Sequence, residues 1–330
     1  EELSLDEVVD LVRGPEGSIV VLSISRPGFK EPFDVEIERT RIPQTSVRFS
    51  FLIEPDIGYV RLSEFSNTST REVQDAIRNL TDQGMTRLIF DLRNNPGGPL
   101  DAAVGVSDLF LEKGQLITST RGRTPENNTV FDAPGNPNGF DGPLVILVNQ
   151  GSASASEIVA GAVQDHDRGL VLGDATWGKG LVQTVFTVRD TGLALTTARY
   201  YTPSGRCIQR DYESFIDYVT YRNGNAETTT EIFETDAGRT VMGGGGITPD
   251  IVVENRTLSE SMVRLFSVSA FFRFGVEVLA DVPEEKYAEF AAGFDVDEEI
   301  LDRFWSWVVE EEILDPGIIE SLQEDPVESA

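Results

Sequence analysis

The chain has 330 residues, of which 40% are hydrophobic and 25% are charged, and this length allows two or three packed domains. Its formal net charge of −29 argues against nucleic-acid binding, because phosphate contacts need clustered lysine and arginine side chains. The single cysteine, Cys207, excludes an internal disulfide and a cysteine-based metal site, and no apolar run approaches the ~18 residues of a membrane span.

The N-terminal stretch predicts one short helix and two strands. Ser4 and Glu7 have the spacing of a capping box, and apolar residues follow at helical spacing up to Arg13. A glycine-proline turn then leads into strand-like runs at 18–25 and 33–38. Composition alone indicates only a small helix-strand-strand unit here.

Beyond a linker at Ile42-Pro43, helices and strands alternate. The predicted strands and helices, in chain order, are a hairpin at 47–53 and 57–65, a helix at 70–84, a strand at 87–91, a helix at 100–111 and a strand at 143–149. Residues 118–142 are rich in glycine, proline and asparagine and predict a loop over a cleft. Later strands are predicted at 169–172, 181–186 and 192–201.

Residues 151–183 contain candidate catalytic residues. Small residues from Gly151 to Ala155 connect a buried strand to a helix, and they include Ser152 and Ser154. Backbone N–H groups at a helix start are unpaired, so a serine there lies beside donors for a developing oxyanion. A strand-glycine-turn-helix arrangement also occurs at Gly97-Gly98, where it presents donors in the same way.

A serine nucleophile needs a base, and the chain offers two candidates. The only histidine, His166, lies about three helical turns beyond the serines, too far for a Ser-His-Asp triad. Lys179 stands between glycines and two apolar strands, where burial favours the neutral amine that can act as a general base. On local context, a surface lysine in a glycine turn remains the alternative.

The run Gly151-Ser-Ala-Ser-Ala-Ser-Glu-Ile158, with Gly178-Lys-Gly180 and Gln183, resembles the C-terminal processing peptidases, also called tail-specific proteases. In that family, a Ser/Lys dyad is spaced by 25 positions, and a glutamine follows the lysine by four. The resemblance therefore implies Ser154 as nucleophile, Lys179 as general base and Gln183 as the residue that orients the lysine. Glu157 matches a family acid, and a capping carboxylate at a helix start is an equal alternative for it.

The same resemblance implies an oxyanion hole and a domain order. One donor would be the N–H of Gly97 or Gly98, between which the sequence does not choose, and the other would be the N–H of Ala155. The helix-strand-strand unit resembles the closing half of a PDZ domain. The expected fold is mixed α/β (α+β), with a crotonase-like ββα core. The expected domains are 1–43, half of a PDZ domain, 44–257, the protease core, and 258–330, an acidic helical appendage.

Three other functions fit parts of the same sequence. Gly173 to Lys179 fits a P-loop, but Gly180 stands where magnesium binding needs serine or threonine, and strands follow where a helix is required. A non-catalytic peptide-binding member of the same fold is the main alternative. A crotonase-type enzyme acting on thioesters would share the turns and the oxyanion hole but would not need Lys179.

The sequence thus predicts a serine endopeptidase that cleaves proteins at or near exposed, unstructured C-terminal tails. No cofactor and no metal are expected, the partners are protein or peptide substrates, and homo-oligomerisation is left open. The chain opens at Glu1 inside a domain, which indicates an excised fragment, so a missing targeting segment says nothing about location. The family implies an extracytoplasmic location, in bacteria the periplasm.

Overall fold

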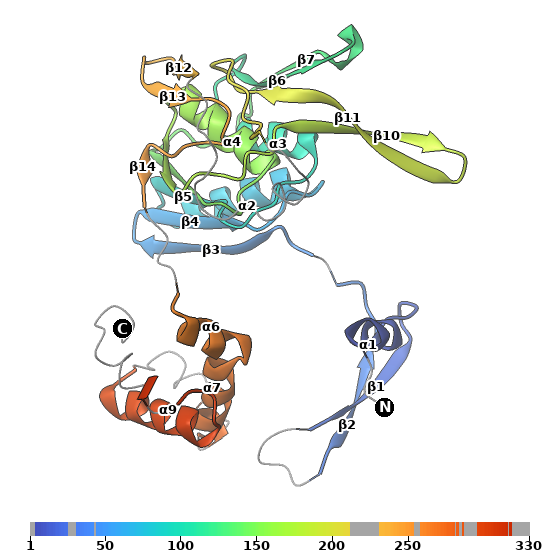
Figure 1. The fold of residues 1–330 in the computed structure, drawn as a ribbon, viewed down its shortest axis with the longest axis vertical. Coiled ribbons are helices and arrows are strands. Elements are labelled where there is room, and N and C mark those ends of the chain that lie inside the picture. Colours follow the sequence, from blue (N-terminus) through green and yellow to red (C-terminus); the bar gives the residue numbers. More distant parts are fainter. Residues whose placement is uncertain are drawn as a thin grey trace. The chain divides into compact units, whose positions relative to one another are not determined.

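The computed structural model describes residues 4–25, 31–42, 44–211, 231–253, 258–280, 282–283, 286, 296–315 and 317–318. Residues Gln44–Asn255 form one compact unit (Figure 1). The segments before and after this unit are described separately below.

The N-terminal segment consists of helix α1 (Leu5–Val12) and strands β1 (Ile19–Ile24) and β2 (Phe33–Glu38). The predicted capping box starts α1: Ser4 N donates to Glu7 Oε2 at 2.8 Å, and Glu7 N donates to Ser4 Oγ at 3.4 Å. The two strands pair antiparallel. The order helix-strand-strand is therefore as the sequence predicts, while its assignment to a PDZ domain stays a prediction.

A six-stranded sheet forms the base of the central unit. Its strands are β3 (Val47–Glu54), β4 (Ile57–Leu62), β5 (Arg87–Asp91), β8 (Leu144–Val148), β9 (Leu170–Gly173) and β14 (Ile251–Val252). The spatial order is β14-β9-β8-β5-β4-β3, and every neighbouring pair except β3–β4 is parallel. The predicted hairpin and the predicted strands at 87–91 and 143–149 all lie in this sheet.

Helices α2 (Ser69–Asp82), α3 (Leu100–Ser107) and α4 (Ala155–Asp165) pack in series beside the sheet and share one hydrophobic core with it (Figure 1). Burial alternates along β4 and β8, so one face of each strand points into this core. Along α4, all residues are buried, which fits a helix enclosed between neighbouring elements. The central unit is thus a mixed α/β structure, as expected, and the crotonase-like detail stays a prediction.

A second, antiparallel sheet has the order β10-β11-β6-β7. It consists of β6 (Leu116–Gly122), β7 (Thr129–Asp132), β10 (Leu181–Val188) and β11 (Thr191–Tyr201). The prediction of a loop across 118–142 was wrong for β6 and β7. Strand β6 forms because it pairs with β11, from Gly122–Ala198 to Ser119–Tyr201. The local composition of 118–142 does not indicate this pairing, because the partner strand is distant in the chain.

The C-terminal segment contains helices α6 (Glu260–Ser267), α7 (Ala270–Ala280) and α9 (Glu298–Glu310), which confirms its helical pattern. Phe274, Phe304 and Trp307 lie in a small core of their own, whereas Phe272 is exposed and Phe290 lies outside the described residues. Phe274, Phe304 and Trp307 therefore serve packing within this segment. Within the described part of the chain, no helix has the length and apolar character needed to span a bilayer.

Candidate active site

Three loops meet at one edge of the six-stranded sheet. Strands β5, β8 and β9 are parallel neighbours, so the segments that follow them leave the sheet on the same side. These segments are 92–99, which leads into α3, 149–154, which leads into α4, and 174–180, which leads into β10. They contain Gly97 and Gly98, Ser154, and Lys179, so the topology brings the predicted site residues to one place.

Ser154 occupies a strained position at the start of α4. Its backbone has φ 55° and ψ −111°, a conformation that residues with a side chain rarely adopt. Such strain persists only where the surroundings enforce it, and it is typical of functional sites, including the turn that presents a catalytic serine. The strained backbone therefore supports Ser154 as the functional residue of this turn.

The two neighbouring serines are engaged otherwise. The buried hydroxyl of Ser152 donates to Leu92 O at 2.7 Å, and that of Ser156 donates to Asn95 O at 3.0 Å. Both bonds tie the serine turn to the 92–99 loop. Neither hydroxyl is therefore available as a nucleophile, and the choice among the three serines, which local sequence leaves open, falls on Ser154.

Glu157 connects the serine turn to the lysine loop. Its side chain is fully buried and accepts four hydrogen bonds. Oε2 accepts the backbone N–H of Ser154 at 2.7 Å and that of Lys179 at 2.9 Å. Oε1 accepts the Thr176 hydroxyl at 2.6 Å and the Gly178 N–H at 2.7 Å. Glu157 thus does cap a helix start, and the same carboxylate also holds the segment that carries Lys179.

The electrostatic state of Glu157 reflects two opposing effects. Burial raises the pKa of this carboxyl above its ordinary value, while the four donors act to lower it. Each of the four donors faces a carboxylate oxygen, and an ionised carboxylate is an acceptor only. The site therefore contains a desolvated acidic group that fixes three backbone N–H groups and the Thr176 hydroxyl.

The lysine loop has a second set of anchors, which sequence reasoning missed. Gly180 N donates to the side-chain oxygen of Gln209 at 2.9 Å, and Gln209 Nε2 donates to Arg210 O at 2.7 Å. Arg210 N in turn donates to Gly178 O at 3.0 Å. The residues on both sides of Lys179 are thereby fixed. Gln209 lies outside the regular strands, so no periodic pattern in the sequence could have identified it.

Lys179 is partly buried, and Gln183 is exposed beside a bulge in β10. Among the hydrogen bonds of the described residues, none joins Lys179 Nζ to Ser154 Oγ or to Gln183. Catalytic hydrogen bonds are often incomplete without substrate and tighten in the complex. Glu157 fixes the backbone positions of Ser154 and Lys179 relative to each other.

The 92–99 loop is fastened to the serine turn through asparagines. Asn94 N donates to Asn149 Oδ1 at 2.8 Å, and Asn149 Nδ2 donates to Asn94 Oδ1 at 3.0 Å. Ala153 N donates to Asn95 O at 2.9 Å. These bonds give the two halves of the expected oxyanion hole one rigid arrangement.

The structure distinguishes the two glycines of this loop. Gly97 N donates to Asn95 Oδ1 at 2.9 Å, so that N–H is occupied. Within the described residues, the N–H groups of Gly98 and Ala155 donate to no protein acceptor. A Cβ added to Gly97 would lie 2.8 Å from both Ala155 N and Ser154 Cβ, which shows how closely the loops approach. The geometry favours Gly98 over Gly97 as the partner of Ala155.

Asp91 stands at the base of the 92–99 loop and is fully buried. It accepts Arg93 Nη2 at 2.7 Å and the Tyr59 hydroxyl at 2.6 Å. Burial alone would raise the pKa of Asp91, but the hydrogen bonds from Arg93 and Tyr59 outweigh it and hold the pKa below its ordinary value. The resulting carboxylate stabilises the first turn of the loop that carries the glycines.

The remaining candidates lie away from this site or do not fit it. His166 caps the far end of α4, about 18 Å of helix from Ser154. The segment after Lys179 continues as β10, whereas a phosphate-binding loop would open a helix. In the part of the chain that the structure describes, no group of three or more His, Cys, Asp or Glu side chains is arranged to hold a metal ion.

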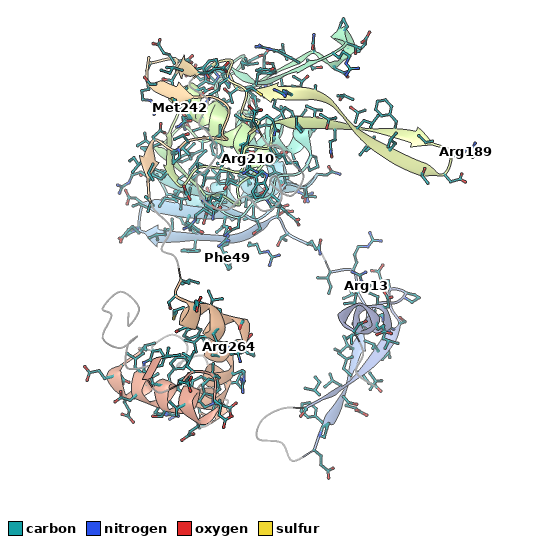
Figure 2. The ribbon with its side chains drawn as sticks, viewed as in Figure 1. Arg13, Phe49, Arg189, Arg210, Met242 and Arg264 are labelled. Atoms are coloured by element: carbon teal, nitrogen blue, oxygen red, sulfur yellow. The ribbon has the colours of Figure 1, made fainter. Side chains whose placement is uncertain are left out.

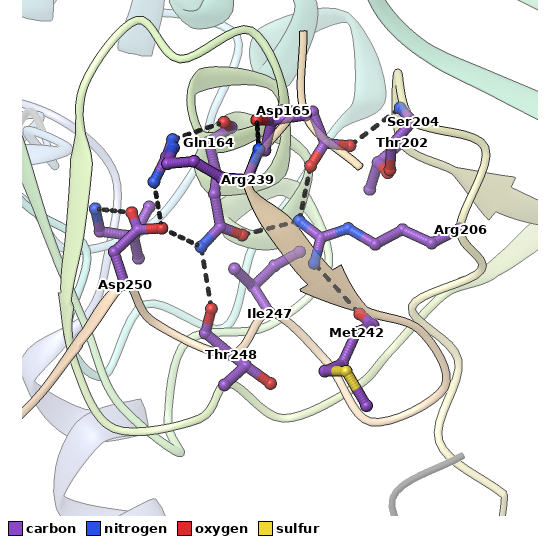
Figure 3. A network of polar contacts seen from close by, with 12 residues as sticks. Gln164, Asp165, Thr202, Ser204, Arg206, Arg239, Met242, Ile247, Thr248 and Asp250 are labelled. Carbon is purple, nitrogen blue, oxygen red and sulfur yellow. Dashed lines mark hydrogen bonds and ion pairs between the residues drawn. The ribbon is translucent and has the colours of Figure 1, made fainter. Parts of the chain in front are cut away.

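A buried polar network holds the other end of α4 (Figure 3). Arg206 and Asp165 are both fully buried and form an ion pair at 2.7 Å. Arg206 also donates to Gln164 Oε1 at 2.7 Å, and Gln164 Nε2 donates to Asp250 Oδ1 at 3.0 Å. The helix that presents Ser154 is therefore anchored at both termini by buried carboxylates.

Part of the chain is similar to known proteins. Residues 56–214 match the family model described as peptidase family S41. The carboxy-terminal-processing protease of Bartonella bacilliformis is 45% identical over 212 residues, which cover 62% of this chain and 48% of the relative. The carboxyl-terminal-processing protease of a Synechocystis species is 40% identical, over 64% of this chain and 49% of the relative.

A solved structure titled photosystem II D1 C-terminal processing protease is 30% identical, with a TM-score of 0.49, over 79% of this chain and 62% of that chain. This chain spans about half the length of the curated relatives it matches.

Proposed function

We propose that this chain, whose residues 56–214 match the model of peptidase family S41, belongs to that family and is a serine endopeptidase with Ser154 as nucleophile and Lys179 as general base. The observation that supports this most is the carboxylate of Glu157, whose Oε2 binds the backbone N–H of both residues. A contact shared by two residues 25 positions apart fixes their separation in space. Trp177 N also donates to Ser152 O at 2.9 Å, so the segment that carries Lys179 is tied to the serine turn at a second point.

In the proposed reaction, the neutral amine of Lys179 takes the proton of the Ser154 hydroxyl as Oγ bonds to the scissile carbonyl carbon. The carbonyl oxygen becomes an oxyanion and accepts hydrogen bonds from the N–H groups of Ala155 and Gly98. The intermediate collapses as the Lys179 ammonium protonates the leaving amine, which leaves an acyl ester on Ser154. Water, deprotonated by the same lysine, then hydrolyses the ester.

The substrate class follows the relatives rather than the site itself. The matched relatives are named as carboxy-terminal-processing proteases, so we propose that this enzyme cleaves proteins at or near exposed, unstructured C-terminal tails. Gln183 is proposed to orient the lysine once substrate is bound. An extracytoplasmic location, in bacteria the periplasm, is part of the same proposal.

The test is the cleavage of β-casein, an unstructured protein, by single variants. Ser154→Ala and Lys179→Ala should each lower kcat/KM by at least about 10⁴-fold, as removal of a nucleophile or its base does in serine peptidases. Lys179→Arg should be equally inactive, because a guanidinium cannot act as a base at neutral pH. Ser152→Ala and Ser156→Ala are the matched controls and should retain far more activity.

The result also separates the alternatives. A non-catalytic peptide-binding member of the fold is compatible with the lack of a hydrogen bond between Ser154 Oγ and Lys179 Nζ among the described residues, and it would leave β-casein intact at every enzyme concentration. A crotonase-type enzyme would act on acyl thioesters and would tolerate Lys179→Ala. Activity that persists in Ser154→Ala would remove the dyad from consideration.

A further inference from the structure

Strands β10 and β11 form a long hairpin that extends away from the rest of the central unit, with Arg189 at its tip (Figures 1 and 2). Between Leu181 and Ala198, the only charged residues are Arg189 and Asp190 in the turn, although 25% of the whole chain is charged. The hairpin is therefore an uncharged surface in a strongly acidic protein, and such a surface marks an interaction site.

One face of the hairpin is apolar and open. The register pairs Phe186 with Leu193, so these side chains and their neighbours two positions away share a face. The apolar face consists of Phe186, Val188, Leu193 and Leu195, and each of these residues is 45–48% exposed. An exposed apolar strand pair of this kind favours contact with another extended chain.

The backbone of β10 offers the means of such pairing. Among the residues that the structure describes, β10 is an edge strand, since its one partner there is β11. The two-residue turn Arg189–Asp190 is flanked by the hydrogen-bonded pair Val188–Thr191, and hydrogen-bonded and non-hydrogen-bonded pairs then alternate. This alternation directs the N–H and C=O groups of Gln183, Val185 and Thr187 toward the open edge.

The open edge leads directly to the proposed active site. β10 begins at Leu181, two residues after Lys179, and Lys179 is linked through Glu157 to Ser154. Gly180 is fixed on both sides, because its N–H donates to Gln209 and its C=O accepts Tyr200 N at 2.8 Å. A polypeptide that paired along β10 would therefore be held at a set position relative to the nucleophile.

We propose that the edge of β10 and the apolar face of the hairpin bind the polypeptide substrate by strand addition, and that they select extended, uncharged segments rich in apolar and β-branched residues. This inference rests on the proposed function and specifies the substrate class of the same site. Main-chain hydrogen bonds to β10 give the affinity, and the apolar face gives the selectivity. An unstructured tail meets the requirement because it can become extended without unfolding a domain.

Peptide binding tests this proposal independently of cleavage. The probe is a fluorescein-labelled 12-residue peptide of alternating valine and serine, and its binding to the 330-residue Ser154→Ala protein is followed by fluorescence anisotropy. Adding Phe186→Ser and Leu193→Ser to this protein should weaken binding of the peptide by about tenfold. This is the size of effect expected when large apolar side chains are removed from an interface. Val130→Ser is the matched control, because Val130 is an exposed apolar residue on β7, the opposite edge strand of the same sheet.

Two peptide variants probe the backbone and the charge. Two methylated peptides are compared, one with N-methyl groups on the odd-numbered residues and one with them on the even-numbered residues. One of the two should lose binding and the other should keep it, since only alternate residues of an added strand direct their N–H groups toward β10. Replacing the serines by glutamates should weaken binding. Equal binding by the hairpin double variant and the parent protein would overturn the proposal, as would equal loss in Val130→Ser or insensitivity to both methylation frames.

Light scattering tests whether a second copy of the chain, rather than substrate, covers the apolar face of the hairpin. If a second copy of the chain covered the hairpin, the double variant would convert an oligomer to a monomer, and the proposal would be overturned. The proposed function fails separately, if the unmodified enzyme cleaves no peptide or protein. If the unmodified enzyme cleaves protein but the hairpin variants still bind the probe fully, the strand-addition proposal is refuted and the proposed function stands.

Discussion

The backbone N–H of Lys179 donates to Glu157 Oε2 across 2.9 Å, although the two residues lie 22 positions apart in the chain. Because the same oxygen accepts the N–H of Ser154, one buried atom contacts both residues that we propose to perform the chemistry. Glu157 contacts neither substrate nor reacting atoms in this arrangement. It acts as a positioning residue through the backbone.

Glu157→Gln should lower kcat/KM by roughly 10²–10³ with the fold retained. A glutamine amide has one acceptor oxygen and one NH₂ group, so two of the four backbone and hydroxyl donors would face another donor. The loop that bears Lys179 would shift, and a displacement of about 1 Å can cost 10²-fold in rate. The measurement is β-casein cleavage, with circular dichroism to confirm folding.

Glu72→Gln is the matched control for this variant. Glu72 Oε2 likewise accepts two backbone N–H groups, from Ser46 at 2.7 Å and Val47 at 3.1 Å, but at the start of β3. Its replacement should lower thermal stability and leave kcat/KM unchanged. Equal loss of activity in both variants would show that Glu157 matters only for overall stability.

Gly97→Ala should also inactivate the enzyme, by about 10²-fold or more. Gly97 has φ 95°, and an added Cβ would lie 2.7 Å from Ala153 O and 2.8 Å from Ala155 N, where the proposed oxyanion binds. Loss of one oxyanion donor costs about 10²–10³ in kcat. The rate of acyl-enzyme formation, measured with an activated ester, is the appropriate readout.

Gly114→Ala separates the steric effect from backbone strain. Gly114 has φ 88°, close to that of Gly97, but an added Cβ would meet no heavy atom within 4 Å. Both variants should lose about 1–2 kcal/mol of stability from the left-handed backbone conformation. Only Gly97→Ala should lose activity, and full activity in that variant would contradict the placement of the oxyanion beside Ala155.

The elements that sequence predicts best are those with a strong local pattern. The strand at 87–91 and the helix at 155–165 follow apolar periodicity, and parallel strand ends explain why Gly97, Ser154 and Lys179 meet. The 25-residue spacing of Ser154 and Lys179 carries the family resemblance. These features depend on residues close in sequence or on a general rule of sheet topology.

Other features depend on single contacts between distant residues, which no local pattern contains. Whether Gly97 or Gly98 has a free N–H is decided by the orientation of the Asn95 side chain. The role of Gln209 depends on its bond to Gly180, 29 positions away, and strand β6 depends on its pairing with β11. Local composition rich in glycine and asparagine therefore suggested a loop where a distant partner creates a strand.

Asp91→Asn should destabilise the central unit at neutral pH, and the effect should shrink in acid. The folded-state pKa of Asp91 lies below its ordinary value of 3.8 because Arg93 and Tyr59 stabilise the carboxylate, despite burial. A lowered pKa gives stability that is present above pH 3.8 and is lost as the pH falls through the folded-state pKa. The expected loss at pH 7 is about 1–3 kcal/mol.

Urea unfolding of both proteins from pH 7 to pH 3 measures this difference. The gap in the free energy of unfolding should narrow as the pH falls below 3.8. Asp75→Asn is the control, because Asp75 forms an exposed surface pair with Arg78 and should change stability little. A gap of constant size across this pH range would mean that Asp91 stabilises the loop without its charge.

Arg206→Met should be the most destabilising of these substitutions, at about 3–5 kcal/mol. Arg206 and Asp165 have no exposed side-chain surface, so removal of the guanidinium leaves a buried carboxylate with only the Ser204 N–H, at 3.0 Å, among the described contacts (Figure 3). Gln164 also loses its donor at 2.7 Å. The C-terminal end of α4 would then lack the network that fixes it.

The double variant Arg206→Met/Asp165→Leu distinguishes a buried-charge penalty from loss of packing. Replacing both partners removes the unpaired carboxylate, so the double variant should be more stable than Arg206→Met alone, as apolar replacement of buried ion pairs commonly is. Urea unfolding followed by circular dichroism measures the coupling between the two sites. If the two single losses simply add, the pair contributes through packing, and the charge of Asp165 is compensated by groups other than Arg206.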